Sequence, residues 1–99
     1  MKELLIHINK AFESKARLGI MSVLMVNEQM DFNNLKELLD LTDGNLASHL
    51  KALEEQEYIA VNKQFIGRKP NTTYRATDNG KKAFESHLTA LENLIKGYR

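Results

Sequence analysis

The sequence predicts a single, mainly α-helical domain with one small β-hairpin. Apolar residues recur at helical spacing over most of the 99 residues. Glycine and proline bracket a turn between two β-prone runs, and positive charge gathers around that turn. A chain of this length has room for one domain, residues 1–99, with a thin core that oligomerisation commonly supplements.

Composition narrows the class of protein. The chain is 42% hydrophobic and 27% charged and has no cysteine, so disulfides and thiolate metal sites are excluded. The first ten residues include polar and acidic side chains and form no apolar signal core. No stretch approaches the roughly 20 apolar residues that span a bilayer. These features predict a cytoplasmic protein with no membrane partner.

Three helices are expected before the middle of the chain. Apolar residues at helical spacing over residues 4–12 predict a short first helix, and Ser14 can cap a second. Asn33 or Asn34 opens a brief third helix, since Asn34 and Glu37 have the spacing of a capping box.

A fourth helix, residues 43–56, completes a helix-turn-helix. Thr42 is its expected cap, and Asp43 in the first turn complements the helix dipole. One apolar stripe fixes the side that faces inward: Leu46, Leu50 and Leu53. Only Leu41 and the cap separate this helix from the third.

A hairpin and a long helix follow. Residues 58–65 and 72–76 are predicted strands, with the turn at 67–71. Thr77 caps the final helix, which runs close to the C-terminus and extends about 30 Å.

The final helix carries an apolar seam at heptad spacing. Its distal half should overhang the core, and an exposed apolar seam usually marks an interface. We therefore predict a homodimer. The alternative is that this helix folds back on its own core beside the first helix. The predicted dimer residues are Leu4, Leu5, Ile8, Phe84, Leu88, Leu91, Ile95 and Tyr98.

Charge is unevenly distributed in a chain whose net charge is only +1. Residues 28–57 hold eight acids and two lysines, whereas residues 61–82 hold six cations and Asp78 as the one acid. A local basic segment suits an anion-facing surface. A solvated strand pair whose lysines deter edge pairing would look the same.

Two runs carry a family resemblance. Leu41–Glu54 has the pattern LTxGNLxxHLxxLE, and Gly67–Tyr74 has the pattern GRxPxTxY. Both resemble the small branch of MarR/ArsR-like winged-helix transcriptional regulators of bacteria and archaea, and the resemblance covers residues 14–84.

The resemblance implies a winged helix-turn-helix with core 14–77 and N- and C-terminal dimerisation helices, 1–13 and 78–99. It implies sequence-specific binding of double-stranded DNA by a homodimeric transcriptional regulator. Helix 43–56 would enter the major groove, and wing 66–72 would contact the backbone or the minor groove.

One residue departs from the family's pattern. Members usually carry glycine where this chain has Glu57, just after the helix expected in the groove. Glycine there serves a left-handed C-terminal cap, which glutamate fills poorly. The helix is expected to end differently by a residue, which leaves the exact angle of the wing open but not the fold.

The candidate DNA-binding residues lie on helix 43–56 and on the wing. Short side chains let a helix sit deeply in a groove about 12 Å wide, where Asn45 can pair with an adenine edge. Arg68 can enter a narrow minor groove. His49, which precedes Leu50, is also a candidate for packing. The set is Thr42, Asp43, Asn45, Ser48, His49, Lys51, Lys63, Arg68, Lys69, Asn71, Thr72 and Thr73.

Other functions have less support. A protein-interaction winged helix without DNA binding is the main alternative, because acids beside the fourth helix would repel phosphate. The sequence has no glycine-rich phosphate loop, metal-ligand cluster or Ser–His–acid set, so no enzyme, metal or cofactor is predicted. His7 and His87 could meet on the terminal helices, but two histidines alone are poor evidence for a metal or pH sensor. The operator and any effector stay open.

Overall fold

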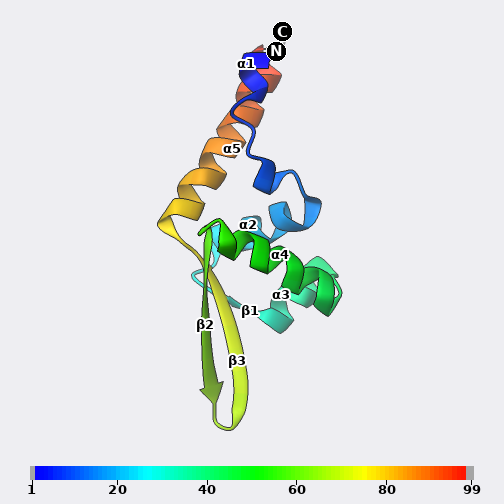
Figure 1. Ribbon diagram of the computed structural model, residues 1–99, viewed down its shortest axis with the longest axis vertical. Coiled ribbons are helices and arrows are strands. Elements are labelled where there is room, and N and C mark those ends of the chain that lie inside the picture. The colour runs from blue at the N-terminus through cyan, green and yellow to red at the C-terminus, as the bar shows by residue number, and fades with distance from the viewer. Residues whose placement is uncertain (1, 98–99) are drawn as a thin grey trace.

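The computed structural model describes residues 2–97 and is elongated, with extents of 56, 25 and 21 Å. Its radius of gyration is 15.0 Å, whereas a compact domain of 100 residues has about 13 Å. Figure 1 shows two terminal helices projecting at one end and a long hairpin at the other, with the helical body between them. The elements are α1 (Lys2–Leu5), η1 (Lys10–Phe12), α2 (Lys15–Val26), β1 (Met30–Asp31), α3 (Phe32–Leu39), α4 (Asp43–Glu55), β2 (Ile59–Ile66), β3 (Lys69–Ala76) and α5 (Asp78–Gly97).

Side-chain caps fix where three of the helices begin. The hydroxyl of Ser14 accepts the backbone N–H of Arg17 at 3.3 Å, and that of Thr42 accepts the N–H of Asn45 at 3.2 Å. The hydroxyl of Thr77 accepts the N–H of Gly80 at 2.9 Å. Each cap satisfies a donor that the first helical turn leaves free. The three predicted caps are confirmed.

The start of α3 differs from the prediction. Asp31 is the cap, and its carboxylate accepts the backbone N–H of Asn34 at 2.7 Å, so neither Asn33 nor Asn34 opens the helix. Asp31 also pairs with Thr73 in the short strand β1. The cap was missed because the preceding strand forms only when the distant β3 is in place.

The sheet has three antiparallel strands in the order β1-β3-β2, rather than the two of a lone hairpin. The turn is also tighter than predicted, because Ile66 pairs with Lys69 and only Gly67 and Arg68 lie between them. Gly67 has a φ of 65°, which suits glycine in a two-residue hairpin. Pro70 lies within β3 where β1 does not reach, so its missing N–H faces an open edge.

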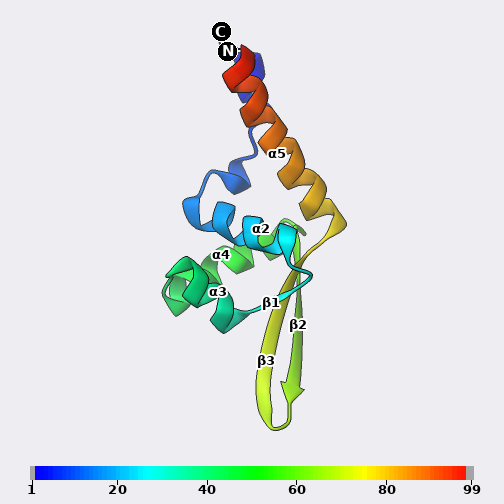
Figure 2. The same cartoon turned by 180° about the vertical axis from the view of Figure 1, so that it is seen from behind.

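The predicted first helix is broken. After α1 the chain extends at Asn9 and forms the 3₁₀ turn η1, in place of one helix over residues 4–12. The backbone N–H of Asn9 donates to Nδ1 of His87 at 3.0 Å, and its side chain accepts the N–H of Ala11. The break lets Phe12 enter the core while α1 lies along the distal part of α5 (Figure 2).

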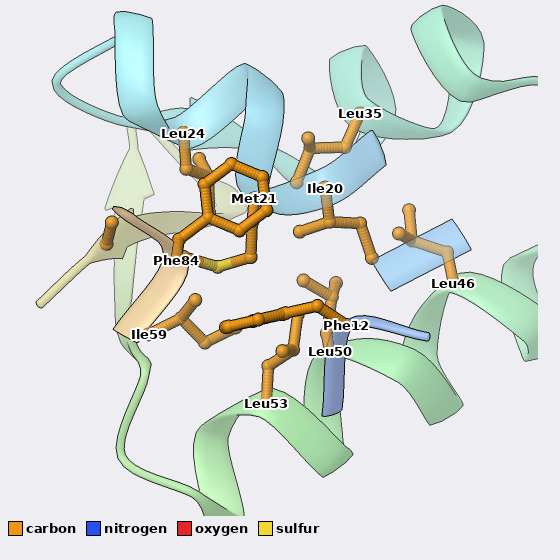
Figure 3. Close-up of a cluster of buried hydrophobic side chains, with 11 residues drawn as sticks. Phe12, Ile20, Met21, Leu24, Leu35, Leu46, Leu50, Leu53, Ile59 and Phe84 are labelled. Carbon is orange, nitrogen blue, oxygen red and sulfur yellow. The ribbon is translucent and has the colours of Figure 1, made fainter. Parts of the chain in front are cut away.

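The helical body has one hydrophobic core (Figure 3). The rings of Phe12 and Phe84 meet edge to face, with centroids 5.2 Å apart. Phe84 is only 3% exposed because it is buried in the core of its own chain. Its predicted place in a dimer interface is therefore wrong. The close-up labels the main members of this core: Phe12, Ile20, Met21, Leu24, Leu35, Leu46, Leu50, Leu53, Ile59 and Phe84.

The chain leaves α4 through a left-handed residue. Glu57 has a φ of 62°. Its backbone N–H donates to the carbonyl oxygen of Glu54 at 2.9 Å, and the N–H of Tyr58 donates to the carbonyl oxygen of Leu53 at 3.0 Å. This pair of bonds is the Schellman motif, which ordinarily carries glycine at the position of Glu57. The helix itself ends at Glu55 with Gln56 as its cap, one residue short of the predicted range 43–56.

The start of α5 packs tightly on the base of the hairpin. A Cβ added to Gly80 would lie 1.9 Å from the carbonyl oxygen of Tyr58, far closer than two non-bonded atoms can approach. Only glycine fits there. Within residues 2–97, no helix combines the length and apolar character that crossing a membrane requires.

Candidate nucleic-acid interface

The outer face of α4 is short and polar. Leu46, Leu50 and Leu53 are 0–3% exposed, which confirms the predicted inward stripe. Over residues 43–51 the opposite face carries no large side chain except that of a lysine, so a groove could approach this part of the helix backbone closely. The exposed residues of this stretch are Asp43, Gly44, Asn45, Ala47, Ser48 and Lys51.

The N-terminus of α4 combines free backbone donors with a neutralised acid. The first amides of a helix are natural phosphate contacts, and Thr42 occupies only one of them. Asp43 would repel phosphate, but Nζ of Lys36 lies 2.7 Å from its carboxylate. This pairing cannot be predicted from the sequence, because it depends on how α3 and α4 lie relative to each other.

His49 lies against α2 rather than at the outermost surface. It is half-buried, and its Nδ1 is 3.2 Å from Nη1 of Arg17. Arg17 in turn donates from Nε to the carbonyl of Ala11, so it ties η1, α2 and α4 together. This geometry favours the packing role of His49 over base contact, and Arg17 is a positioning residue that the sequence did not reveal.

The wing formed by β2, β3 and their turn is entirely free of acidic residues. Between positions 59 and 76 there are four cations and no aspartate or glutamate. All four are exposed: Lys63, Arg68, Lys69 and Arg75. Arg75 is exposed while its neighbour Tyr74 packs against the core, which agrees with the expected alternation. The wing is therefore a projecting cationic ribbon.

Three polar residues of β3 are less accessible than predicted. Thr73 is only 5% exposed, because it lies between Asn62 of β2 and Asp31 of β1, so its predicted contact with DNA is wrong. Asn71 and Thr72 are half-buried and line a hollow of about 260 Å³ between β3 and the start of α3.

Burial shifts the pKa of two ionisable groups. Burial raises the pKa of the Tyr74 phenol, and the carboxylate of Glu54 adds to this shift. Burial lowers the pKa of the His87 imidazole, against the opposing effect of the Glu13 carboxylate. His87 accepts a backbone hydrogen bond, whereas His7 is exposed. In the part of the chain described, no three His, Cys, Asp or Glu side chains gather as a metal site would require.

The arm formed by α1 and α5 leaves apolar side chains in water. Leu88 and Ile95 on α5 are 46% and 70% exposed, and Leu5 on α1 is 50% exposed. Leu91 is partly buried between them. Leu4 and Ile8 are also partly buried, and Tyr98 lies outside the described residues. An exposed stripe of this kind on a projecting helix is characteristic of an interface.

Together, the helix-turn-helix and the cationic hairpin define a winged-helix DNA-binding protein. Residues 16–95 match the family described as the winged helix DNA-binding domain, and the chain belongs to that family. It is 39% identical over 87 residues to an uncharacterized protein of Methanocaldococcus jannaschii, a match that covers 88% of this chain and 95% of the relative.

Solved structures agree with this assignment. A transcriptional regulator homologue from Pyrococcus horikoshii OT3 superposes with a TM-score of 0.85 at 32% identity, covering 98% of this chain and 94% of that one. YusO of Bacillus subtilis has the same fold, with a TM-score of 0.78 at 17% identity over 98% and 71% of the two chains. The predicted resemblance to small winged-helix transcriptional regulators is confirmed. Regulators of this kind typically have no enzymatic activity.

PadR of Bacillus subtilis, solved in complex with operator DNA, matches a smaller part of the fold. Its TM-score is 0.64 at 17% identity, over 73% of this chain and 46% of that protein. At this identity the likeness concerns the fold alone.

Proposed function

We propose that the chain is a homodimeric transcriptional regulator that binds double-stranded DNA with sequence specificity. In this proposal α4 lies in the major groove and residues 66–72 of the wing lie on the backbone or in the minor groove. The observation that carries the proposal is the combination of a short polar face on α4 with an acid-free cationic hairpin. Both are features that a polyanionic duplex requires.

The acids of α4 fit the proposal once their positions are considered. Lys36 pairs with Asp43 at the N-terminal end, where the groove contact is proposed. Glu54 and Glu55 lie in the last turn, at the other end of α4. This separation keeps the recognition end of the helix near neutral, so phosphate can approach Thr42, Asn45 and Ser48.

The proposed dimer uses the arm. Residues 14–77 form the DNA-binding unit, and segments 1–13 and 78–99 carry the self-association surface. Leu88, Leu91 and Ile95 recur along one side of α5, and the arm projects away from the wing in both views (Figures 1 and 2). Two arms packed together would remove these apolar side chains from water. The two α4 helices would then approach two half-sites of one duplex.

The test is fluorescence anisotropy with a pool of random-sequence duplexes, titrated at low and at physiological salt and followed by selection of bound sequences. Affinity that falls with salt and enrichment of a near-palindromic site support the proposal, because each phosphate contact releases counterions. The matched variant, Arg68→Ala with Lys69→Ala, should bind every sequence more weakly and with a flatter salt slope.

Absence of binding even at low salt would overturn the proposal. A winged helix that docks on a protein is the second candidate, supported by the acidic balance of residues 28–57. An apolar protein contact would show little dependence on salt, which separates the two functions in the same titration series.

A further inference from the structure

The tip of the wing exposes two large apolar side chains. Phe65 is 73% exposed and Ile66 is 64% exposed, and they directly precede the turn that carries Arg68. Single exposed apolar residues are ordinary, but two adjacent ones at the end of a projecting ribbon form a distinct apolar tip. Contact between the cations and phosphate does not require them.

The register places apolar groups on both faces of the ribbon. Phe65 pairs with Pro70, so these two rings lie on one face, and Ile66 pairs with Lys69 on the other. The two-residue turn at Gly67 holds this arrangement at the extreme end of the hairpin. The ends of β2 and β3 therefore form a wedge with an apolar side chain on each side.

The positive charge around the wing tip indicates that this surface binds a polyanion. Arg68 and Lys69 flank the apolar tip, Lys63 lies behind it, and the hairpin has no acidic residue to oppose a polyanion. Apolar wedges of Phe, Ile or Pro flanked by Arg and Lys are a recurrent means by which proteins enter the minor groove of DNA.

We propose that the wing tip enters the minor groove as an apolar wedge and bends the duplex. The proposal rests on the proposed function and specifies how the wing reads DNA. A strand layer with its side chains is about 10 Å thick, whereas the minor groove of B-form DNA is about 6 Å wide, so the tip fits only where the groove opens. Opening is easiest at flexible TA and CA steps, so the wedge adds preference for such steps under the wing.

A tryptophan placed at the tip tests insertion directly. The chain has no tryptophan, so Phe65→Trp gives one reporter of the wing. With a duplex selected by the wild type, the indole should be quenched by base contact and protected from acrylamide. The matched control is Val26→Trp, at a position 82% exposed at the end of α2, outside α4, the wing and the arm, whose emission should not change.

Bending is tested with Phe65→Ala and Ile66→Ala on end-labelled duplexes by energy transfer. Each variant should reduce the bend and weaken binding to a site with a TA step under the wing about tenfold, with an unchanged salt slope. Arg68→Ala with Lys69→Ala should flatten the slope instead. Both apolar positions are exposed, and unchanged thermal unfolding of the variants verifies the fold.

The outcomes separate the wedge from DNA binding itself. If the wild type binds no duplex, the proposed function fails and the wedge fails with it. If the wild type binds but both alanine variants bend DNA equally well, or Phe65→Trp emission does not respond, the wedge alone is overturned. A tip that responds to phosphatidylserine vesicles but not to DNA also overturns it, in favour of a membrane contact.

Discussion

Replacement of Glu57 by glycine should stabilise the protein. Glu57 holds a φ of 62° in the Schellman motif that ends α4, and its own N–H and that of Tyr58 both bond back into the helix. The motif therefore forces a residue with a Cβ into the left-handed region. Glycine relieves the contact between the Cβ and the backbone without changing either hydrogen bond.

The expected gain in the free energy of unfolding is the difference between two opposing effects. The left-handed conformation costs a residue with a Cβ about 1–2 kcal/mol. Replacement by glycine removes this cost but gives back about 0.5–1 kcal/mol, because a glycine makes the unfolded chain more flexible. The two ranges leave a net gain of about 0–1.5 kcal/mol at Glu57, and its midpoint, about 0.75 kcal/mol, raises the unfolding temperature of a domain this size by about 3–6 °C.

The assay is thermal and urea unfolding of Glu57→Gly beside Glu57→Ala, at one protein concentration because the proposed dimer couples stability to concentration. The alanine variant removes the same charge but keeps the Cβ, so the difference between the two isolates the backbone. A glycine variant no more stable than the alanine variant would refute the reasoning. Asp40→Gly is a second comparison, since Asp40 has a φ of 52° and aspartate tolerates that region better.

Three further predictions concern the arm, the groove contact and the buried histidine. Leu91→Glu should convert the dimer to monomers in sedimentation, and an intact dimer would exclude α5 as the interface. Asn45→Ala should bind selected and scrambled duplexes with similar affinity, and retained discrimination would exclude Asn45 as a base contact. Burial holds the pKa of His87 below its ordinary value, so the unfolded chain takes up more protons below about pH 6.5. Stability against urea should fall as the pH drops through that region, by up to about 1.4 kcal/mol per pH unit, and His87→Gln should remove this loss.

The predictable parts of the fold depended on local chemistry. Ser14, Thr42 and Thr77 cap helices through atoms within three residues, and the leucine stripe of α4 follows from helical period alone. At Glu57 the sequence identified the position but not the outcome, because glutamate was expected to fill a left-handed cap poorly, whereas Glu57 adopts the left-handed conformation with both hydrogen bonds of the motif.

The missed parts depended on distant partners. The chain breaks at Asn9 because His87 accepts its N–H, and Asp31 caps α3 while paired with Thr73. Thr73 is buried because the third strand, β1, pairs with it. Phe84 lies in the core rather than on the apolar seam of α5 because its ring packs against that of Phe12. None of these contacts leaves a periodic pattern in the sequence.

On the wing, the cations were evident in the sequence but the apolar tip was not singled out. The sequence predicts an ordinary strand that ends at Phe65 and a wing that begins at Ile66. Their exposure follows from the length of the hairpin, which carries them beyond the reach of β1 and the helical body. Strand length and burial are tertiary properties, so this part of the site required the structure.

The contact between Gly80 and Tyr58 fixes the direction in which α5 leaves the base of the hairpin. Because α5 leaves the hairpin base with no room for adjustment, the direction of its apolar seam is locked to the direction of α4. One residue inserted in α5 between Phe84 and Leu88 would turn the distal seam by about 100° relative to the DNA-binding unit, since a helix has 3.6 residues per turn. In the proposed dimer, the distance between half-sites is therefore encoded in the number of residues in this helix, and descendants of one ancestor could acquire new operators by changing it.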